Sequence, residues 1–418
     1  MIKLDANKIM KGSPPPLEYQ VTLENWRKYP YNIWAFVNVR NIIPTSSIKF
    51  DAKQKIDFIK KLTNLEEIKI SHNNTEKKLK DILVDCNTDS LLVMHRGKLV
   101  FEFFNNFTTY ETPHIIFSIS KSLTSLLTGI LVDKKLIDVN TTVSKILPET
   151  IGSAYDDATI RNVLDMNVAS NFIEDYSGKA EIFQKYRSST GWDIPSNNDM
   201  THLSGLHEFL SNLPKSMHLH GKKYHYCSPH SDLLGWIIER VSGEKYSKII
   251  SDLLFKPSGI KNDANVTLDR FGATRSAGGI SISPYDLLLI SEMVRTNGAN
   301  KNGQIVPENW INDIKNYEDN SCYLNQDDLK RFPNGNYRSK WYQTGFEENE
   351  FCAIGIHGQN IWINPKKELT IIRMSSASDP INIKTEELMF SVFKEIGNAL
   401  VSVSYAHLRA HETFANRV

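Results

Sequence analysis

Phe117-Ser118-Ile119-Ser120-Lys121-Ser122-Leu123-Thr124 joins a β-prone run, residues 114–117, to the start of a strongly amphipathic helix. After this stretch, apolar residues recur at spacings of three and four, at Leu123, Leu126, Leu127, Ile130 and Leu131. This spacing places them on one face of a helix that packs against a core. Ser118 therefore lies where a strand-like segment turns into a buried helix.

Ser118 and Lys121 form one of five Ser-x-x-Lys tetrads in the chain, so the tetrad alone indicates little. The other four begin at Ser46, Ser242, Ser258 and Ser391. Two of these lie beside a glycine in expected turns, one falls in a weakly patterned region, and one falls inside a helix. Only the tetrad at Ser118 opens a helix directly after a strand-like run.

At the first turn of a helix, this pair suits nucleophilic catalysis. Residues i and i+3 share a helix face, so Lys121 can hydrogen-bond the hydroxyl of Ser118. The positive end of the helix dipole favours negative charge on the serine oxygen, and together with burial it disfavours the proton on Lys121. A plain helix cap at Ser118 beside a solvated lysine explains the local pattern equally well.

The segments around this helix predict a mixed fold. Leu91–His95 and Lys98–Phe104 form an expected hairpin, and further strand-like runs lie between 351 and 375. Helical patterns fill the interval between them, and another helix follows at 388–396. We therefore predict an α+β fold, in which an antiparallel β-sheet flanked by helices is built from both ends of the chain and an all-helical domain is inserted between.

The same order of segments predicts the domains. Residues 1–80 are expected to form an N-terminal arm packed on the body. The sheet domain takes 81–121 and 271–400, and the helical domain takes 122–270. The last stretch, 401–418, is polar and unpatterned, so we expect a disordered tail or one foreign to the protein.

The composition excludes some partners. The 418 residues carry 49 Lys and Arg against 48 Asp and Glu, which gives no basic excess for nucleic acid or an anionic membrane. The first twenty residues lack the apolar centre of a secretion signal, and no window offers a membrane span. The four cysteines are scattered without paired spacing and are expected to be free thiols. We therefore expect a cytoplasmic protein that is a monomer or a homodimer.

The run 117–124 resembles the active-site segment of class C β-lactamases and their relatives, which include DD-peptidases, β-lactamase-fold esterases and 6-aminohexanoate-dimer hydrolases. Further family-like pieces follow in the expected order, at Leu92–Val100, Val143–Pro148, Thr159–Leu164, Tyr226–Ser228 and Ala277–Gly279. The resemblance implies a β-lactamase/transpeptidase-like fold. It also implies that Ser118 is the nucleophile and that Lys121 is its proton partner.

The second element of the resemblance is Tyr226, which matches the tyrosine of the family's Tyr-x-Asn motif. The implied role is a phenol that shuttles protons among Ser118, Lys121 and the leaving group. Ser228 stands in the Asn position, where the family contacts substrate. A packed aromatic residue is the plain alternative for Tyr226.

The third element is usually Lys-Thr-Gly, and here it is Ala353-Ile354-Gly355. The missing lysine argues against β-lactam hydrolysis. The following Ile356-His357-Gly358-Gln359 resembles the 6-aminohexanoate-dimer hydrolase branch. By that match the backbone N–H groups of Ser118 and Ile356 form the oxyanion hole, and His357 lies at the substrate.

Two further substrate contacts come from the same branch. Glu174-Asp175-Tyr176 resembles a loop whose tyrosine contacts the substrate amide, which makes Tyr176 a candidate. The run 337–342 resembles a stretch with a pocket-side aromatic residue, which makes Trp341 another. A loop tyrosine without a role and a core tryptophan are the alternatives.

Three other functions stay open. His218, His220, His225, Cys227, His230 and Asp232 crowd into fifteen residues and could hold zinc in a metallohydrolase, although no H-E-x-x-H motif is present. A β-lactamase or DD-peptidase activity is the second alternative, and a catalytically silent binding module is the third.

The sequence favours a serine hydrolase that forms an acyl-enzyme with small carboxylic esters or linear amides. In this interpretation Ser118, Lys121 and Tyr226 perform the chemistry. The expected partner is a small-molecule substrate, with no nucleic acid and no membrane. No metal and no organic cofactor is expected.

Overall fold

Strands from two distant parts of the chain meet in one large sheet. The computed structural model describes residues 5–73, 75–194, 204–326 and 331–415, with side chains as far as Ser402. Within these residues the sheet has the order β12 (Asn336–Arg338), β13 (Trp341–Gln343), β14 (Phe351–Gly355), β15 (Gln359–Asn364), β16 (Leu369–Ser375), β5 (Thr88–His95), β6 (Lys98–Phe104) and β2 (Ile59–Lys60). Neighbours pair antiparallel, except that β2 runs parallel to β6. The expected hairpin and the expected joining of the two ends are both confirmed.

Helices cover both faces of this sheet. Along β5, Leu92 and Met94 belong to the core beside α10 (Pro284–Arg295), which contacts β5, β15 and β16. Leu91 and Val93 belong instead to the core that contains the apolar side chains of α13 (Ile383–Ala415). Because successive side chains of a strand point to opposite faces, a central strand covered on both faces is apolar throughout. All eight residues of β5 are buried accordingly.

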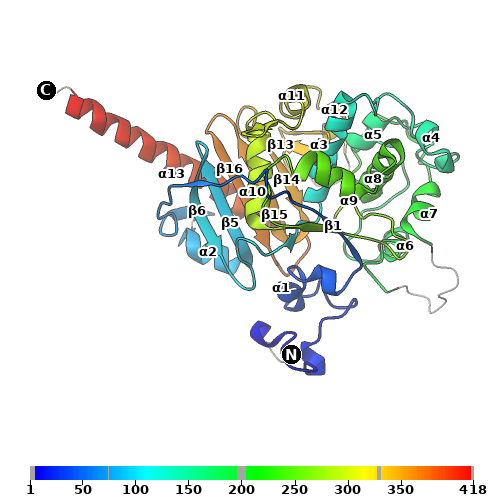
Figure 1. Cartoon of the computed structure of the whole chain (residues 1–418), viewed down its shortest axis with the longest axis horizontal. Coiled ribbons are helices and arrows are strands. Elements are labelled where there is room, and N and C mark those ends of the chain that lie inside the picture. Colours follow the sequence, from blue (N-terminus) through cyan, green and yellow to red (C-terminus); the bar gives the residue numbers. More distant parts are fainter. Residues whose placement is uncertain (1–4, 74, 195–203, 327–330, 416–418) are drawn as a thin grey trace.

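A mostly helical region lies beside the sheet in Figure 1. It follows the short strand β7 (His114–Ile115) and contains α3 (Ile119–Asp133), α4 (Val143–Ile146), α5 (Ile160–Leu164), α6 (Glu181–Ser189), α7 (Leu206–Ser211), α8 (Ser228–Ser242) and α9 (Tyr246–Ile250). Gly243 ends α8 in the left-handed conformation, as the sequence indicates. The α+β architecture with a helical insertion is therefore present.

A second sheet joins this region to the rest of the molecule. Its strands have the order β1 (Thr45–Ile48), β8 (Ala264–Thr267), β9 (Ile280–Ile282) and β7. The stretch expected to be helical as far as residue 270 thus ends in a strand, which pairs with β1 of the N-terminal arm. The arm is therefore part of the fold.

Short elements complete the described chain. The helices are α1 (Tyr31–Ala35), α2 (Leu79–Asp85), α11 (Glu308–Asn316) and α12 (Ser321–Leu324). Two hairpins are β3 (Lys69–His72) with β4 (Thr75–Lys78), and β10 (Ala299–Asn300) with β11 (Gly303–Gln304). Single turns are η1 (Ala6–Lys8), η2 (Leu17–Tyr19), η3 (Val39–Asn41), η4 (Pro148–Thr150) and η7 (Ile356–Gly358), and η6 (Ser251–Phe255) is a π-helical turn.

The C-terminal stretch corrects one expectation. Residues 401–415, expected to be disordered or foreign to the protein, continue α13, whose later turns extend away from the body in Figure 1, so the expected disorder is wrong. The stretch contains neither glycine nor proline, so nothing in it interrupts a helix that has already begun.

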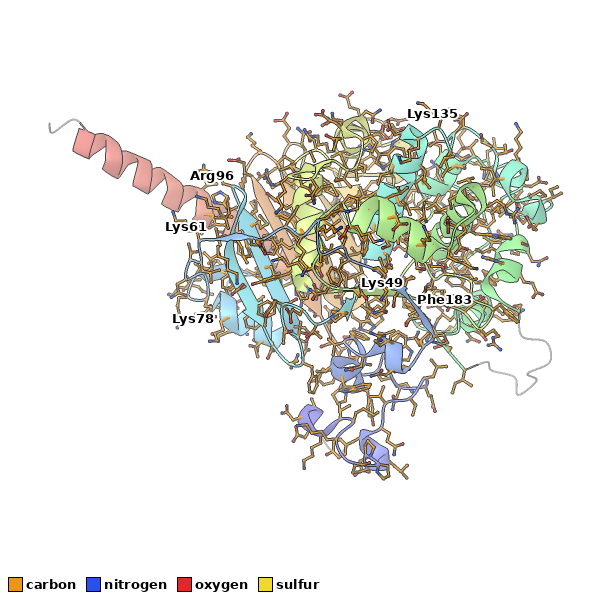
Figure 2. The ribbon with its side chains drawn as sticks, in the orientation of Figure 1. Lys49, Lys61, Lys78, Arg96, Lys135 and Phe183 are labelled. Carbon is orange, nitrogen blue, oxygen red and sulfur yellow. The ribbon has the colours of Figure 1, made fainter. Side chains whose placement is uncertain are left out.

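Charged side chains are spread over the surface. Figure 2 shows Lys49, Lys78, Arg96 and Lys135 on different parts of the molecule. Among the described helices, none is both long and apolar enough to cross a membrane.

Candidate active site

Ser118 lies between β7 and α3, directly after a bend in the backbone at Phe117. Phe117 has a positive φ of 43°, a conformation that costs free energy in a bulky residue and persists only where packing imposes it. Its ring is 4.9 Å from the ring of Phe36 and 6.3 Å from that of Trp26, centroid to centroid. The Ser118 side chain makes no helix-cap hydrogen bond, so the simple cap interpretation is wrong.

Lys121 points at the serine. Its Nζ donates to Ser118 Oγ at 2.8 Å and to the carbonyl of Ala277 at 2.7 Å. The pKa of Lys121 is lowered to about 7, chiefly by burial; the charge of Glu174 opposes this shift and the charge of Arg275 adds to it. Near neutrality a large fraction of Lys121 is therefore an uncharged amine, which can accept the serine proton.

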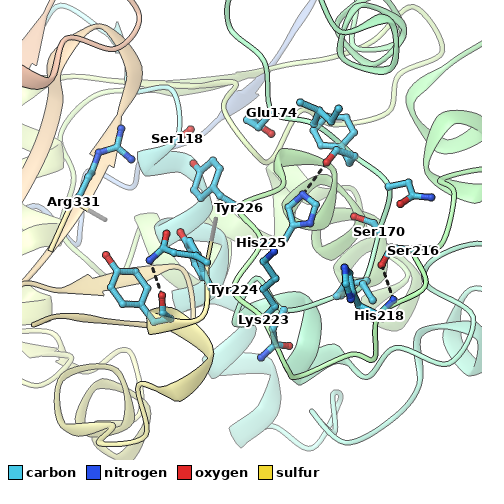
Figure 3. Close-up of a pocket in the computed structure, with 18 of the residues that line it drawn as sticks. Ser118, Ser170, Glu174, Ser216, His218, Lys223, Tyr224, His225, Tyr226 and Arg331 are labelled. Atoms are coloured by element: carbon cyan, nitrogen blue, oxygen red, sulfur yellow. Dashed lines mark hydrogen bonds between the residues drawn. The ribbon is translucent and has the colours of Figure 1, made fainter. Parts of the chain in front are cut away.

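Tyr226 completes the group. Burial raises the pKa of the Tyr226 phenol well above its usual value, and the nearby Ser118 hydroxyl partly opposes this shift. The Lys121 Nζ lies 5.2 Å from the centre of the Tyr226 ring. The three residues that the sequence analysis selects are therefore in mutual reach, as Figure 3 shows for Ser118 and Tyr226.

Ser118 opens onto two cavities. The larger one has a volume of about 1260 Å³ and the smaller one about 420 Å³. Both are lined by Ser118, Glu174, Tyr176 and Ile356. Cavities of this size suit small-molecule substrates, and the serine is placed to react with a ligand that occupies either side.

Ile356 lines both cavities together with Ser118, and Gly355 lets the end of β14 pass close to the segment before the serine. A Cβ at Gly355 would lie 2.6 Å from the Ile116 carbonyl oxygen, far inside contact distance. Only glycine therefore fits where the end of β14 passes the segment before Ser118. This arrangement leaves the predicted oxyanion hole, with donors from Ser118 and Ile356, at the junction of the cavities.

Glu174 links two predicted substrate residues and was not itself predicted. Its carboxylate accepts hydrogen bonds from Tyr176 Oη at 2.7 Å, Ser228 Oγ at 2.6 Å and the Ser228 N–H at 2.8 Å. Tyr176 lines both cavities and Ser228 lines the smaller one. The sequence places Glu174 in the family-like loop, but no local pattern shows that it reaches the start of α8.

His357 and Trp341 have different environments. His357 lines the smaller cavity, and its Nδ1 hydrogen-bonds the carbonyl oxygen of Ala377 at 2.8 Å. Burial lowers the pKa of His357 to about 4, so the ring is neutral at pH 7. Trp341 is fully buried, packs on Phe351 and faces neither cavity. Trp341 therefore belongs to the core, because its position in β13 turns the indole toward the buried face of the sheet. The predicted substrate contact of Trp341 is wrong.

The histidines that are clustered in the sequence contact different partners in the fold. His220 bonds Asp157, His225 bonds the carbonyl oxygen of Phe172, and His230 bonds the Tyr155 hydroxyl. Burial raises the pKa of Cys227, which keeps its thiol protonated. In the described part of the chain, no three metal-binding side chains come together, so the zinc alternative has no ligand set there.

Asp232 has a structural role that the sequence does not show. It is fully buried, pairs with Arg275, and accepts hydrogen bonds from Tyr186 Oη at 2.6 Å and the Ala277 N–H at 2.7 Å. It thereby fixes the segment whose Ala277 carbonyl receives Lys121. The partners are far apart in sequence, so no spacing rule could have found them.

Known proteins resemble this chain over most of its length. The family model described as Beta-lactamase matches residues 80–391. The 6-aminohexanoate-dimer hydrolase of Paenarthrobacter ureafaciens is 28% identical over 382 residues, which cover 91% of this chain and 95% of the relative.

Solved structures share the fold. A proposed 6-aminohexanoate-dimer hydrolase from Bacillus anthracis superposes with a TM-score of 0.84 at 21% identity, and the match covers 93% of this chain and 99% of that one. A family VIII carboxylesterase has a TM-score of 0.55 at 13% identity, over 75% of this chain and 96% of the other. Since the family model matches far more than half of the sequence, the chain belongs to the beta-lactamase family of serine hydrolases.

Proposed function

We propose that Ser118 is the nucleophile of an acyl transfer to water, with Lys121 and Tyr226 as its proton carriers. The observation that carries the proposal is the Lys121 Nζ, 2.8 Å from Ser118 Oγ and with a pKa of about 7. A lysine amine that is partly neutral at physiological pH is a competent general base for a serine hydroxyl.

The steps follow from these contacts. Ser118 Oγ attacks the substrate carbonyl carbon while its proton passes to Lys121 Nζ. The carbonyl oxygen becomes negative and is stabilised by the N–H groups of Ser118 and Ile356. When the intermediate collapses, the bond to the leaving nitrogen or oxygen breaks, and that atom takes the proton from Lys121 directly or through the Tyr226 phenol. Water then attacks the acyl-enzyme by the same route and releases the acid.

The substrates are small carboxylic esters or linear amides. The name of the Paenarthrobacter relative, a 6-aminohexanoate-dimer hydrolase, supports a linear amide. Ala353 stands where the third element usually has its lysine, and His357 is neutral, so this region offers no cation to a β-lactam carboxylate. The larger cavity also has exposed apolar residues around it, namely Ile173, Met217, Leu219, Ile381 and Ile383, which suit a methylene chain.

We also propose that the enzyme works in the cytoplasm as a monomer or a homodimer on a small-molecule substrate. The four cysteines are free thiols, with Cys227 and Cys352 buried, which suits a reducing compartment. Cell fractionation and light scattering of the purified protein test these two statements.

The nucleophile is tested with a fluorophosphonate probe and p-nitrophenyl esters. Wild type should be labelled and active, and Ser118→Ala should lose both properties. Ser46→Ala is the matched control. Ser46 also begins a Ser-x-x-Lys tetrad, but it lies on β1, its hydroxyl bonds that of Ser247 on α9, and it lines neither cavity. Labelling that survives in Ser118→Ala contradicts the proposal. A comparison of short-chain esters, an aminohexanoate dimer and a chromogenic cephalosporin then ranks the substrate classes.

A further inference from the structure

The smaller cavity contains two arginines that share one carboxylate. Arg27 comes from the N-terminal arm, Arg187 from α6 and Asp193 from the loop after α6, and all three line the cavity. Arg187 holds Asp193 through Nε at 2.6 Å and Nη2 at 2.9 Å, and Arg27 pairs with the same carboxylate through Nη2. The three side chains are only 16–27% exposed.

Within the part of the chain that the structure describes, two guanidinium groups against one carboxylate leave one positive charge unbalanced. Arg275, the next cation, is paired separately with Asp232. The pKa of Arg27 is lowered to about 10, chiefly by burial; Asp193 opposes this shift, and the charges of Arg187 and Arg275 add to it. Arg27 therefore remains charged at pH 7 among other cations, and an incoming anion would relieve this repulsion.

Donors remain on both arginines for such an anion. Within the described residues, Asp193 engages one nitrogen of Arg27 and two of Arg187, whereas each guanidinium carries five N–H groups. Aromatic rings hold the two groups in place, with Arg27 4.9 Å from the centre of Trp26 and Arg187 5.8 Å from that of Phe183. A planar, pre-oriented guanidinium pair is suited to bidentate recognition of a carboxylate.

Among the described residues that line the cavity, the other charges do not cancel this excess. Glu24 and Lys28 are exposed, carry opposite charges and are screened by solvent. Three hydrogen bonds from Tyr176 and Ser228 hold Glu174 at the Ser118 end of the cavity, where its negative charge acts on Lys121. The excess positive charge therefore lies at the arginine pair.

The same cavity reaches the reacting serine, since Ser118, Lys121 and Ile356 also line it. A molecule of moderate length can thus present its carbonyl to Ser118 while its far end lies at Arg27 and Arg187. We propose that this arginine pair binds a carboxylate of the substrate, so that the enzyme prefers linear amides and esters that carry a free acid group. This inference rests on the proposed acyl transfer at Ser118 and specifies its substrate class.

Paired substrates test it. In the first pair, mono-4-nitrophenyl adipate, which has a free carboxylate on the acyl side, is compared with its neutral methyl ester. In the second pair, 4-carboxyphenyl acetate, which has a carboxylate on the leaving group, is compared with the neutral 4-carbamoylphenyl acetate. In wild type, kcat/KM should favour the acid about 10- to 100-fold in one pair, the range expected for charge-assisted hydrogen bonds. The pair that shows the preference identifies the half of the substrate that occupies the cavity.

Variants assign the preference to the arginines. Arg187→Gln and Arg27→Gln should each lose most of the preference for the acid substrate, while their turnover of the neutral esters stays within about threefold of wild type. Lys28→Gln, which removes an exposed cation at the same cavity, should keep it. Asp193→Asn removes the carboxylate that both arginines share, so it should raise the preference for the acid substrate. If the arginine variants do not fold, this variant tests the proposal in their place.

The result that overturns the inference is equal turnover of acid and neutral esters in wild type, or an acid preference that persists in both arginine variants. Failure of the proposed function is distinguishable. In that case the neutral esters are also not hydrolysed, or fluorophosphonate labelling persists in Ser118→Ala. Neutral esters that are hydrolysed through Ser118 without acid preference overturn only the arginine site.

Discussion

Lys121 determines the pH dependence of the reaction. Its pKa is lowered to about 7, chiefly by burial, and only the neutral amine can accept the Ser118 proton. Protonation below pH 7 therefore removes the base, so kcat/KM for a neutral ester should fall about tenfold per pH unit below 7 and level off above it. A pH–rate profile from pH 5 to 9 measures this. A limb near pH 10, as for a solvated lysine, would contradict the assignment.

Glu174 adjusts that pH dependence. Its negative charge is the main effect that raises the pKa of Lys121 against burial. Glu174→Gln removes the charge while an amide oxygen can still accept from Ser228 and Tyr176, so the acid limb of the profile should move to lower pH. Glu149→Gln, an exposed carboxylate paired with Arg240, is the control and should leave the limb in place. A shift of the acid limb to higher pH in Glu174→Gln would contradict the inference that the Glu174 charge raises the pKa of Lys121.

The Tyr226 hydroxyl is expected to carry protons rather than to pack. Tyr226→Phe keeps the ring over Lys121 but removes the hydroxyl beside Ser118, so kcat should fall by about 10²–10⁴. The nearby Tyr224→Phe loses only a hydroxyl contact to Tyr342 at 3.2 Å and should retain most activity. Steady-state kinetics on a p-nitrophenyl ester separate the two, and equal losses would assign Tyr226 to packing.

The end of β14 depends on a glycine. In Gly355→Ala the new Cβ would meet the Ile116 carbonyl oxygen at 2.6 Å, so β14 must move away from the segment before Ser118. We expect a loss of about 1–3 kcal/mol in unfolding free energy. We also expect an activity loss of about 100-fold, since Ile356 moves with the strand.

Denaturant unfolding and ester kinetics measure both effects. Gly397→Ala on α13 is the control, because its Cβ meets only the flexible ends of Leu369 and Lys367 and alanine favours a helix. Unchanged activity in Gly355→Ala would remove Ile356 from the oxyanion hole.

Local patterns predicted the elements that carry the chemistry. Ser118 with Lys121, the 88–104 hairpin and β14 to β16 each have a signal within ten or so residues, in periodicity or turn chemistry. Glu174 with Ser228, Asp232 with Arg275, and Arg27 with Asp193 do not, since each contact joins distant segments through tertiary packing. An aromatic run does not show which side of a strand faces the core, so the sequence leaves Trp341 open between a pocket and a core position, and the structure places it in the core.

Three regions of the chain build the site together. The sheet provides Ile356, the helical region provides Ser118, Lys121, Tyr226 and Glu174, and the arm provides Arg27. In Figure 1 the arm with α1 lies below the junction of the other two. The family match begins at residue 80, so the arm adds one wall of the smaller cavity to a site that the rest of the chain supplies.

Trp26 couples this arm to the nucleophile. It is fully buried, its ring packs on Phe36, Phe117 and Trp192, and its Nε1 donates to the Trp192 carbonyl oxygen at 3.2 Å. Trp26→Ala should therefore lower the unfolding free energy by about 3–5 kcal/mol.

The same variant should lose activity beyond what its stability explains, because Phe117 then loses part of the packing that holds its positive φ next to Ser118. Thermal unfolding and fluorophosphonate labelling well below the melting temperature measure the two effects separately. Leu17→Ala, an arm residue that is 84% exposed, is the control and should change stability by no more than about 0.5 kcal/mol. If Trp26→Ala is destabilised but reacts with the probe at the wild-type rate, the arm stabilises the fold without positioning the serine.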